Sequence, residues 1–138
     1  MCYKTFVRPV LEYGCCVWDP HQENHILDLE KIQKRAARFA TGNHDRTHGS
    51  TARNLAILEW PTLKERRAKI KLKILHKAKL GITDIPLSDL TSNPLTTRRS
   101  STNYRVPQSR LDSHKFSFYP STIRLWNSLP PNLKKCYR

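Results

Sequence analysis

Apolar residues recur at intervals of three and four over residues 23–40, which is the spacing of an amphipathic helix. The stripe consists of Ile26, Leu29, Ile32, Ala36 and Phe39. Asp19 and Pro20 precede the segment as a start signal, and Gly42 follows it, where a left-handed residue ends many helices. The pattern therefore predicts a long helix that buries this stripe against a core.

A second long helix is predicted to begin after Pro61 and to end at Gly81. Thr62 and Glu65 have the spacing of a capping box, in which each side chain satisfies a backbone amide at the helix start. The apolar face of this segment consists of Leu63, Ile70, Ile74, Leu75 and Ala78. Two long amphipathic helices indicate a small helical bundle.

Shorter elements surround these helices. Residues 50–58 are predicted to form a short helix that Ser50 or Thr51 caps. Residues 3–13 also show helical spacing, which Pro9 is expected to kink or split. The three tryptophans are expected in the core, with stacking on nucleic-acid bases as the alternative for the first and the last; they are Trp18, Trp60 and Trp126.

The composition changes near residue 82, because six of the nine prolines lie in residues 84–138. Residues 91–113 are polar and are expected to be extended or disordered. Phe116 and Phe118 alternate with polar residues as in a short strand, and a short helix is predicted to open at Pro120 and to bury Ile123 and Trp126. The predicted fold is mainly α, with a helical bundle over residues 1–83. Residues 84–138 are predicted to form a Pro-rich, partly extended or disordered tail with an ordered block near residues 115–130 and a short terminal helix.

The net charge of the chain indicates which class of partner it binds. The chain has 138 residues, and 25 Lys and Arg against 11 Asp and Glu give a formal net charge of +14. Such an excess favours a polyanion, with nucleic acid ahead of an anionic membrane surface. No apolar run approaches the roughly 20 residues that a bilayer span needs. The four cysteines form no CxxC pair and are interpreted as reduced thiols, which predicts an intracellular protein of the nucleus or cytoplasm without a membrane partner.

The basic residues form a stripe on each predicted long helix. The two stripes consist of Lys31, Lys34, Arg35 and Arg38, and of Arg66, Lys69, Lys73 and Lys77. Cations at this spacing can neutralise successive phosphates of RNA or DNA without reading the bases. A solvated helix face is the alternative interpretation of each stripe.

Catalytic and metal-binding patterns are absent from the sequence. The four glycines lie far apart, so no Gly-rich phosphate loop is present, and neither GxSxG nor HExxH occurs. His21 with His25, and His44 with His48, have an HxxxH spacing, but no third ligand lies nearby and surface histidines are favoured. The acidic residues are scattered, without a pair for two magnesium ions. We therefore expect no enzyme, no metal and no cofactor.

Four segments resemble, in order, the region after the polymerase palm in reverse transcriptases of non-LTR retrotransposons of the jockey and CR1 types. They are FVRPVLEY with VWDP at residues 6–20, LEKIQKRAAR at residues 29–38, LEWPTLKERR at residues 58–67 and SFYPSTIRLWNSLP at residues 117–130. The resemblance spans nearly the whole chain. It implies a thumb-like region over residues 1–83 and a C-terminal extension over residues 84–138.

The resemblance also implies a fragment. The polymerase aspartates of the family belong to a motif upstream of this region, and this chain carries no counterpart of them. Two hypotheses follow. The chain is a non-catalytic remnant that binds template and primer, RNA or DNA, without sequence preference. Alternatively, it is a structural fragment without independent activity, whose apolar faces pack on the missing polymerase palm.

Overall fold

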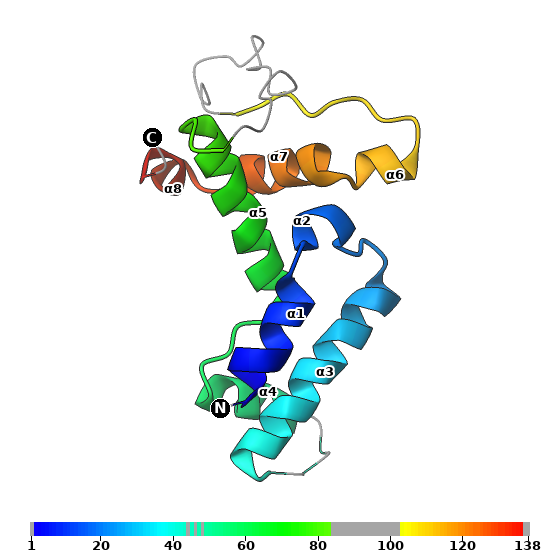
Figure 1. The fold of residues 1–138 in the computed structure, drawn as a ribbon, viewed down its shortest axis with the longest axis vertical. Helices are drawn as coiled ribbons and strands as arrows, with labels where there is room; N and C mark the ends of the chain where they lie inside the picture. Colours follow the sequence, from blue (N-terminus) through cyan, green and yellow to red (C-terminus); the bar gives the residue numbers. More distant parts are fainter. Residues whose placement is uncertain (1, 44, 46, 48, 84–102, 137–138) are drawn as a thin grey trace. The chain divides into compact units, whose positions relative to one another are not determined.

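The computed structural model describes residues 2–43, 45, 47, 49–83 and 103–136, and in these residues every regular element is a helix (Figure 1). The predicted mainly α class is confirmed. The elements in chain order are η1 (Tyr3–Val7), α1 (Arg8–Glu12), α2 (Cys15–Trp18), α3 (Glu23–Thr41), α4 (Ser50–Ile57), α5 (Leu63–Lys79), α6 (Asp112–Lys115), α7 (Phe118–Ser128) and α8 (Pro131–Cys136).

Packing divides the chain into two compact units, Met1–Arg67 and Ala68–Arg138, so that the division falls inside α5. The boundary predicted near residue 82 marks a change of composition and stays a prediction. The extended or disordered connector was predicted for residues 91–113. Of these, residues 91–102 lie outside the described part, residues 103–111 contain no helix, and residues 112 and 113 begin the helix α6, so the prediction is wrong for these two.

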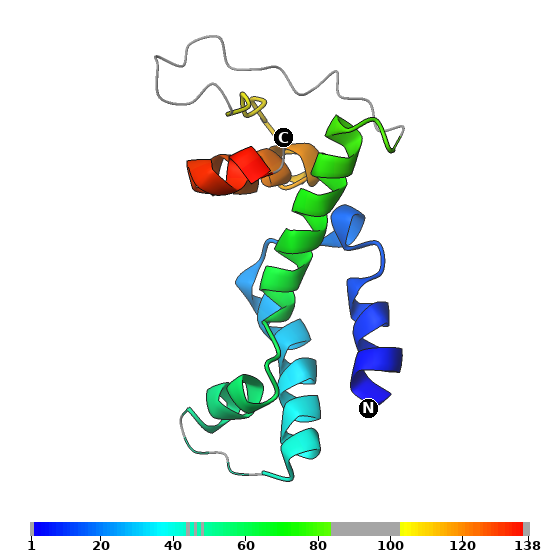
Figure 2. The same ribbon diagram turned by 90° about the vertical axis from the view of Figure 1, so that its left-hand side faces the viewer.

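The local signals placed α3, α4 and α5 correctly. α3 ends at Gly42, whose φ of +65° is the left-handed conformation that glycine adopts without strain. α4 lies beside the C-terminal half of α3 (Figure 1 and Figure 2). At the start of α5, the Glu65 backbone N–H donates to Thr62 Oγ1 at 3.2 Å, as the predicted capping box requires.

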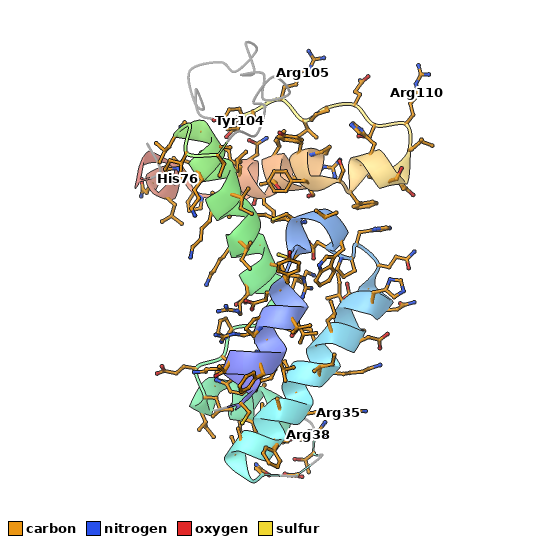
Figure 3. All side chains as sticks on the ribbon, viewed as in Figure 1. Arg35, Arg38, His76, Tyr104, Arg105 and Arg110 are labelled. Atoms are coloured by element: carbon orange, nitrogen blue, oxygen red, sulfur yellow. The ribbon has the colours of Figure 1, made fainter. Side chains whose placement is uncertain are left out.

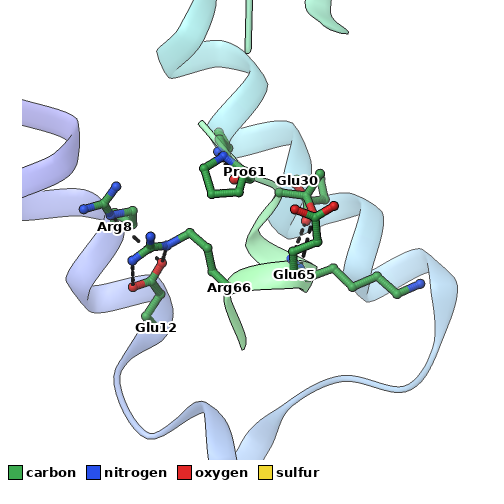
Figure 4. A network of polar contacts seen from close by, with 9 residues as sticks. Arg8, Glu12, Glu30, Pro61, Glu65 and Arg66 are labelled. Atoms are coloured by element: carbon green, nitrogen blue, oxygen red, sulfur yellow. Dashed lines mark hydrogen bonds and ion pairs between the residues drawn. The ribbon is translucent and has the colours of Figure 1, made fainter. Parts of the chain in front are cut away.

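The buried face of α3 differs from the predicted stripe. Ile32 and Phe39 are exposed, whereas the inward face consists of Ile26, Glu30, Gln33 and Ala37. The two polar residues are buried because they bind the backbone at the start of α5. Glu30 Oε1 accepts the Lys64 N–H at 2.8 Å, and Gln33 Nε2 donates to the Pro61 carbonyl at 2.9 Å (Figure 4).

The hydrophobic core of the first unit forms around Trp60, as predicted. Its ring stacks on Tyr3 of η1 with 4.7 Å between the centroids, and Ala37 of α3 completes the cluster. Leu55 and Leu58 of the α4 region pack against it. An indole and a phenol that stack in this way contribute beyond their buried area.

Burial raises the pKa of Tyr3 to about 12, because the phenolate would lose its hydration there. The unfolded chain loses this proton near pH 10, so the free energy of unfolding is expected to fall by about 2–3 kcal/mol between pH 10 and pH 12. Urea unfolding at pH 8 and pH 11.5 measures this change. Tyr3→Phe should abolish this part of the pH dependence and leave the part due to lysines. Tyr13→Phe, which changes an exposed tyrosine, should keep the pH dependence of the wild type. Equal pH dependence in Tyr3→Phe and the wild type would contradict the assignment.

The N-terminal segment is helical, as its spacing predicted, and instead of a break at Pro9 it changes from a π-helical turn to an α-helix one residue before the proline. The π-helical turn η1 ends before Arg8, and Pro9 lies in the first turn of α1, where its missing N–H costs no hydrogen bond. The prediction that Trp18 lies in the core is wrong, since 41% of the residue is exposed. The chain turns at Gly14, and the Trp18 indole folds back on this turn and donates to the Tyr13 carbonyl at 2.6 Å.

The second unit is built around Trp126, which is buried as predicted. Ile123 of α7 is buried with it, and so are Leu75 and Ala78 of α5. The Tyr104 ring lies 6.0 Å from the Trp126 ring, and the backbone of Tyr104 is held by Asn127, whose side-chain amide both donates to it and accepts from it. The C-terminal block is therefore a packed element of this unit.

The strand predicted at Phe116 and Phe118 is wrong. Residues 112–115 form α6, and α7 begins at Phe118, two residues before the predicted start. Ser117 separates the two helices with an extended backbone, and its hydroxyl donates to the His114 carbonyl at 2.7 Å. Alternation over three residues was too short to distinguish a strand from a break between helices. α8, which begins at Pro131, was not predicted.

Candidate nucleic-acid interface

The four candidate cations of α3 do not share one environment. Lys31 forms an ion pair with Asp28, with 2.7 Å between Nζ and Oδ1, and the hydrogen bond lowers the pKa of this carboxyl. The side chains of Lys34, Arg35 and Arg38 form no ion pair or hydrogen bond in the described part of the chain. Figure 3 shows Arg35 extending away from the helix. We call these three residues the α3 set.

Arg66, the first candidate of α5, takes part in holding the first unit together. Its Nη2 donates to Glu12 Oε2 at 2.9 Å and its Nε to Glu12 Oε1, while Arg8 lies 4.0 Å from the same carboxylate (Figure 4). This bidentate bond raises the pKa of Arg66. A guanidinium held in this way is occupied by Glu12, so the prediction that Arg66 binds phosphate loses its support.

The other three candidates of α5 are exposed. The side chains of Lys69, Lys73 and Lys77 form no ion pair or hydrogen bond with any described residue, and we call these three residues the α5 set. Successive members lie four residues apart, which places them one turn apart on one face of the helix. The structure therefore separates the eight candidates into two unpaired sets and two cations that carboxylates hold, Lys31 and Arg66.

Three cations that the sequence did not single out are buried. Arg67 Nε donates to Asp19 Oδ1 at 2.7 Å, Lys71 Nζ lies 3.3 Å from Ser121 Oγ, and Lys134 Nζ donates to the Asn127 carbonyl at 2.9 Å. Burial lowers the pKa of Lys134. The spacing of Arg67, Lys71 and Leu75 places both cations on the apolar face of α5 and was the signal for their burial. These three cations stabilise the folded chain and are not accessible to a ligand.

No metal centre emerges from the described residues, since they contain no group of three or more His, Cys, Asp or Glu side chains that could hold an ion. His21 precedes α3, whereas His25 lies within it, so the pair does not share a helical face. His44 and His48 lie outside the described residues. Of the helices described, none is both long and apolar enough to cross a membrane.

Comparisons with protein-family models, with curated proteins and with solved structures give no match for this chain. The cations of the chain fall into two classes. Carboxylates or the core occupy the side chains of some, whereas nothing in the described structure engages the side chains of the α3 set and the α5 set.

Proposed function

We propose that this chain binds nucleic acid through phosphate contacts from the α3 set and the α5 set, as a non-catalytic remnant of a retrotransposon reverse transcriptase of the type that it resembles. The observation that carries the proposal is the absence of ion-pair partners for these six cations among the described residues. A chain with a net charge of +14 that leaves two helical rows of cations unpaired is suited to a polyanion. This role requires an intracellular location, either nuclear or cytoplasmic.

Phosphate contacts of this kind have a measurable signature in salt. Each neutralised phosphate releases condensed counterions, so the logarithm of the affinity falls with the logarithm of the salt concentration by about 0.9 per contact on a duplex. Six contacts predict a loss of about a thousandfold between 50 and 200 mM salt. Because neither set includes a group that reads base edges, sequence is expected to matter little.

The test is fluorescence anisotropy with a labelled RNA–DNA primer–template, titrated at several KCl concentrations. Lys34→Ala, Arg35→Ala and Arg38→Ala together should lower the salt slope by about 2–3 units, and so should Lys69→Ala, Lys73→Ala and Lys77→Ala together. The matched control replaces three exposed cations outside the sets, Arg53, Lys64 and Arg105, and should lower the slope by less than about one unit. Equal losses in all three variants would mean that the charge acts diffusely, and would refute the proposal.

A second candidate function is favoured by the N-terminal segment. Its outward side chains are apolar and exposed, at Phe6, Val10, Tyr13 and Val17. Several large apolar side chains exposed on one short segment are typical of interaction sites. It supports the alternative of a structural fragment that packs on a missing polymerase palm. This alternative expects self-association in sedimentation velocity and strong binding of an apolar dye, both reduced by Phe6→Ser with Val10→Ser. A monomer that binds no dye would refute it.

A further inference from the structure

A phenylalanine stands exposed among the cations of α3. Phe39 is 84% exposed, although the pattern of the sequence assigns it to the buried stripe. It follows Arg38 directly and lies four residues, or about 6 Å along the axis, after Arg35. Within the described part of the chain its ring contacts no other ring and no cation.

The ring of Phe39 is exposed because α3 buries a different face from the one that the sequence pattern predicts. Gln33 and Ala37 face inward on α3, and residues 35 and 39 lie on the opposite side of the helix. Arg35 and Phe39 are therefore neighbours on the solvent side. By contrast, the rings of Tyr3, Trp60 and Trp126 are buried and pack against other rings. Phe39 thus combines an open aromatic face with adjacent unpaired guanidinium groups.

We infer that α3 binds single-stranded nucleic acid, with one base stacked on the Phe39 ring and the neighbouring phosphates held by Arg35 and Arg38. The inference rests on the proposed function and specifies its ligand. An exposed aromatic ring within a basic surface is the arrangement by which proteins bind single strands without sequence preference. In a duplex both faces of each base are covered by its neighbours, so Phe39 could not stack on a base there. An apolar protein partner is disfavoured, because docking would strip water from the unpaired cations beside the ring.

The test uses the full chain and three labelled probes of equal length: a single-stranded oligonucleotide that contains 2-aminopurine, an abasic strand with the same phosphates, and a duplex. Phe39→Ala should weaken binding of the base-bearing strand about five- to hundredfold, the range found for aromatic rings that stack on bases. It should leave binding of the abasic strand and the duplex unchanged. Phe39→Trp should retain the affinity and the quenching of 2-aminopurine. The matched control is Tyr13→Ala, which removes an aromatic ring that is 85% exposed but lies outside the α3 set.

The outcomes separate the inference from the proposal on which it rests. If Phe39→Ala binds the base-bearing strand as tightly as Tyr13→Ala does, while Arg35→Ala with Arg38→Ala weakens all three probes, α3 binds phosphates without stacking and the inference fails alone. If the arginine variant also binds all three probes as the wild type does, the proposed role of the α3 set fails with it. Equal loss on the abasic strand after Phe39→Ala would mean that the ring supports the helix, and would overturn the inference.

Discussion

Asp19→Ala is expected to destabilise the unit Met1–Arg67 by about 3–5 kcal/mol, which is the cost of removing one partner from a buried ion pair. The Arg67 side chain is 1% exposed, and its Nε donates to Asp19 Oδ1 at 2.7 Å. Its Nη1 and Nη2 atoms are buried without a hydrogen-bond partner among the described residues. Without Asp19 the positive charge therefore stays in the interior uncompensated. Urea unfolding, followed by circular dichroism, measures the loss.

The control is Arg67→Met, which removes the charge and keeps most of the volume. Asp19 is partly exposed and keeps its hydration, so this variant is expected to change the free energy of unfolding by less than about 1 kcal/mol. Adding Arg67→Met to Asp19→Ala should recover most of the stability. If Arg67→Met costs as much as Asp19→Ala, the stability comes from the packing of the arginine and the account of a paired buried charge is wrong.

Trp126→Ala is expected to destabilise the unit Ala68–Arg138 by about 3–5 kcal/mol, as truncation of a buried tryptophan does. The ring is buried beside Tyr104, and Lys79 Nζ lies 5.8 Å from its centroid. The measurement is amide hydrogen exchange in α7 and in residues 68–79, which reports on the stability of this unit.

Leu111→Ala is the matched control, since this side chain is exposed and precedes α6. It should change the free energy of opening that amide exchange measures in α7 by less than about 0.5 kcal/mol. Equal effects of the two variants would contradict the placement of Trp126 at the centre of the second unit.

Signals that lie within one segment of the sequence predicted the helices well. Gly42, the pair Thr62 and Glu65, and the period of three to four residues fixed α3 and α5 almost to the residue. The buried polar contacts were not predictable in this way, because their partners lie far apart in the chain. Glu30 reaches Lys64 across 34 residues, and Arg66 reaches Glu12 across 54. Hydrophobicity alone would place Phe39 inside and Glu30 outside, but the hydrogen bonds of Glu30 with the Lys64 N–H and of Gln33 with the Pro61 carbonyl turn Glu30 inward.

The candidate site was predictable as a set of helical stripes, and only the structure separates its members. Arg35 and Arg66 look alike in sequence, since each lies in a basic row on a long helix. Glu12 holds Arg66, whereas nothing in the described structure holds Arg35. The same distinction applies to Lys71, which is buried, and Lys73, which is exposed. Charge counting overstates the number of cations that a ligand can reach.

The most direct test of this distinction is chemical protection of lysine side chains on the unmodified chain. Acetylation is measured by mass spectrometry with and without the RNA–DNA primer–template. We expect protection of Lys34, Lys69, Lys73 and Lys77, and none of Lys64, which is exposed but lies outside both sets. Weak, uniform protection of every exposed lysine would contradict the claim that the α3 set and the α5 set bind nucleic acid.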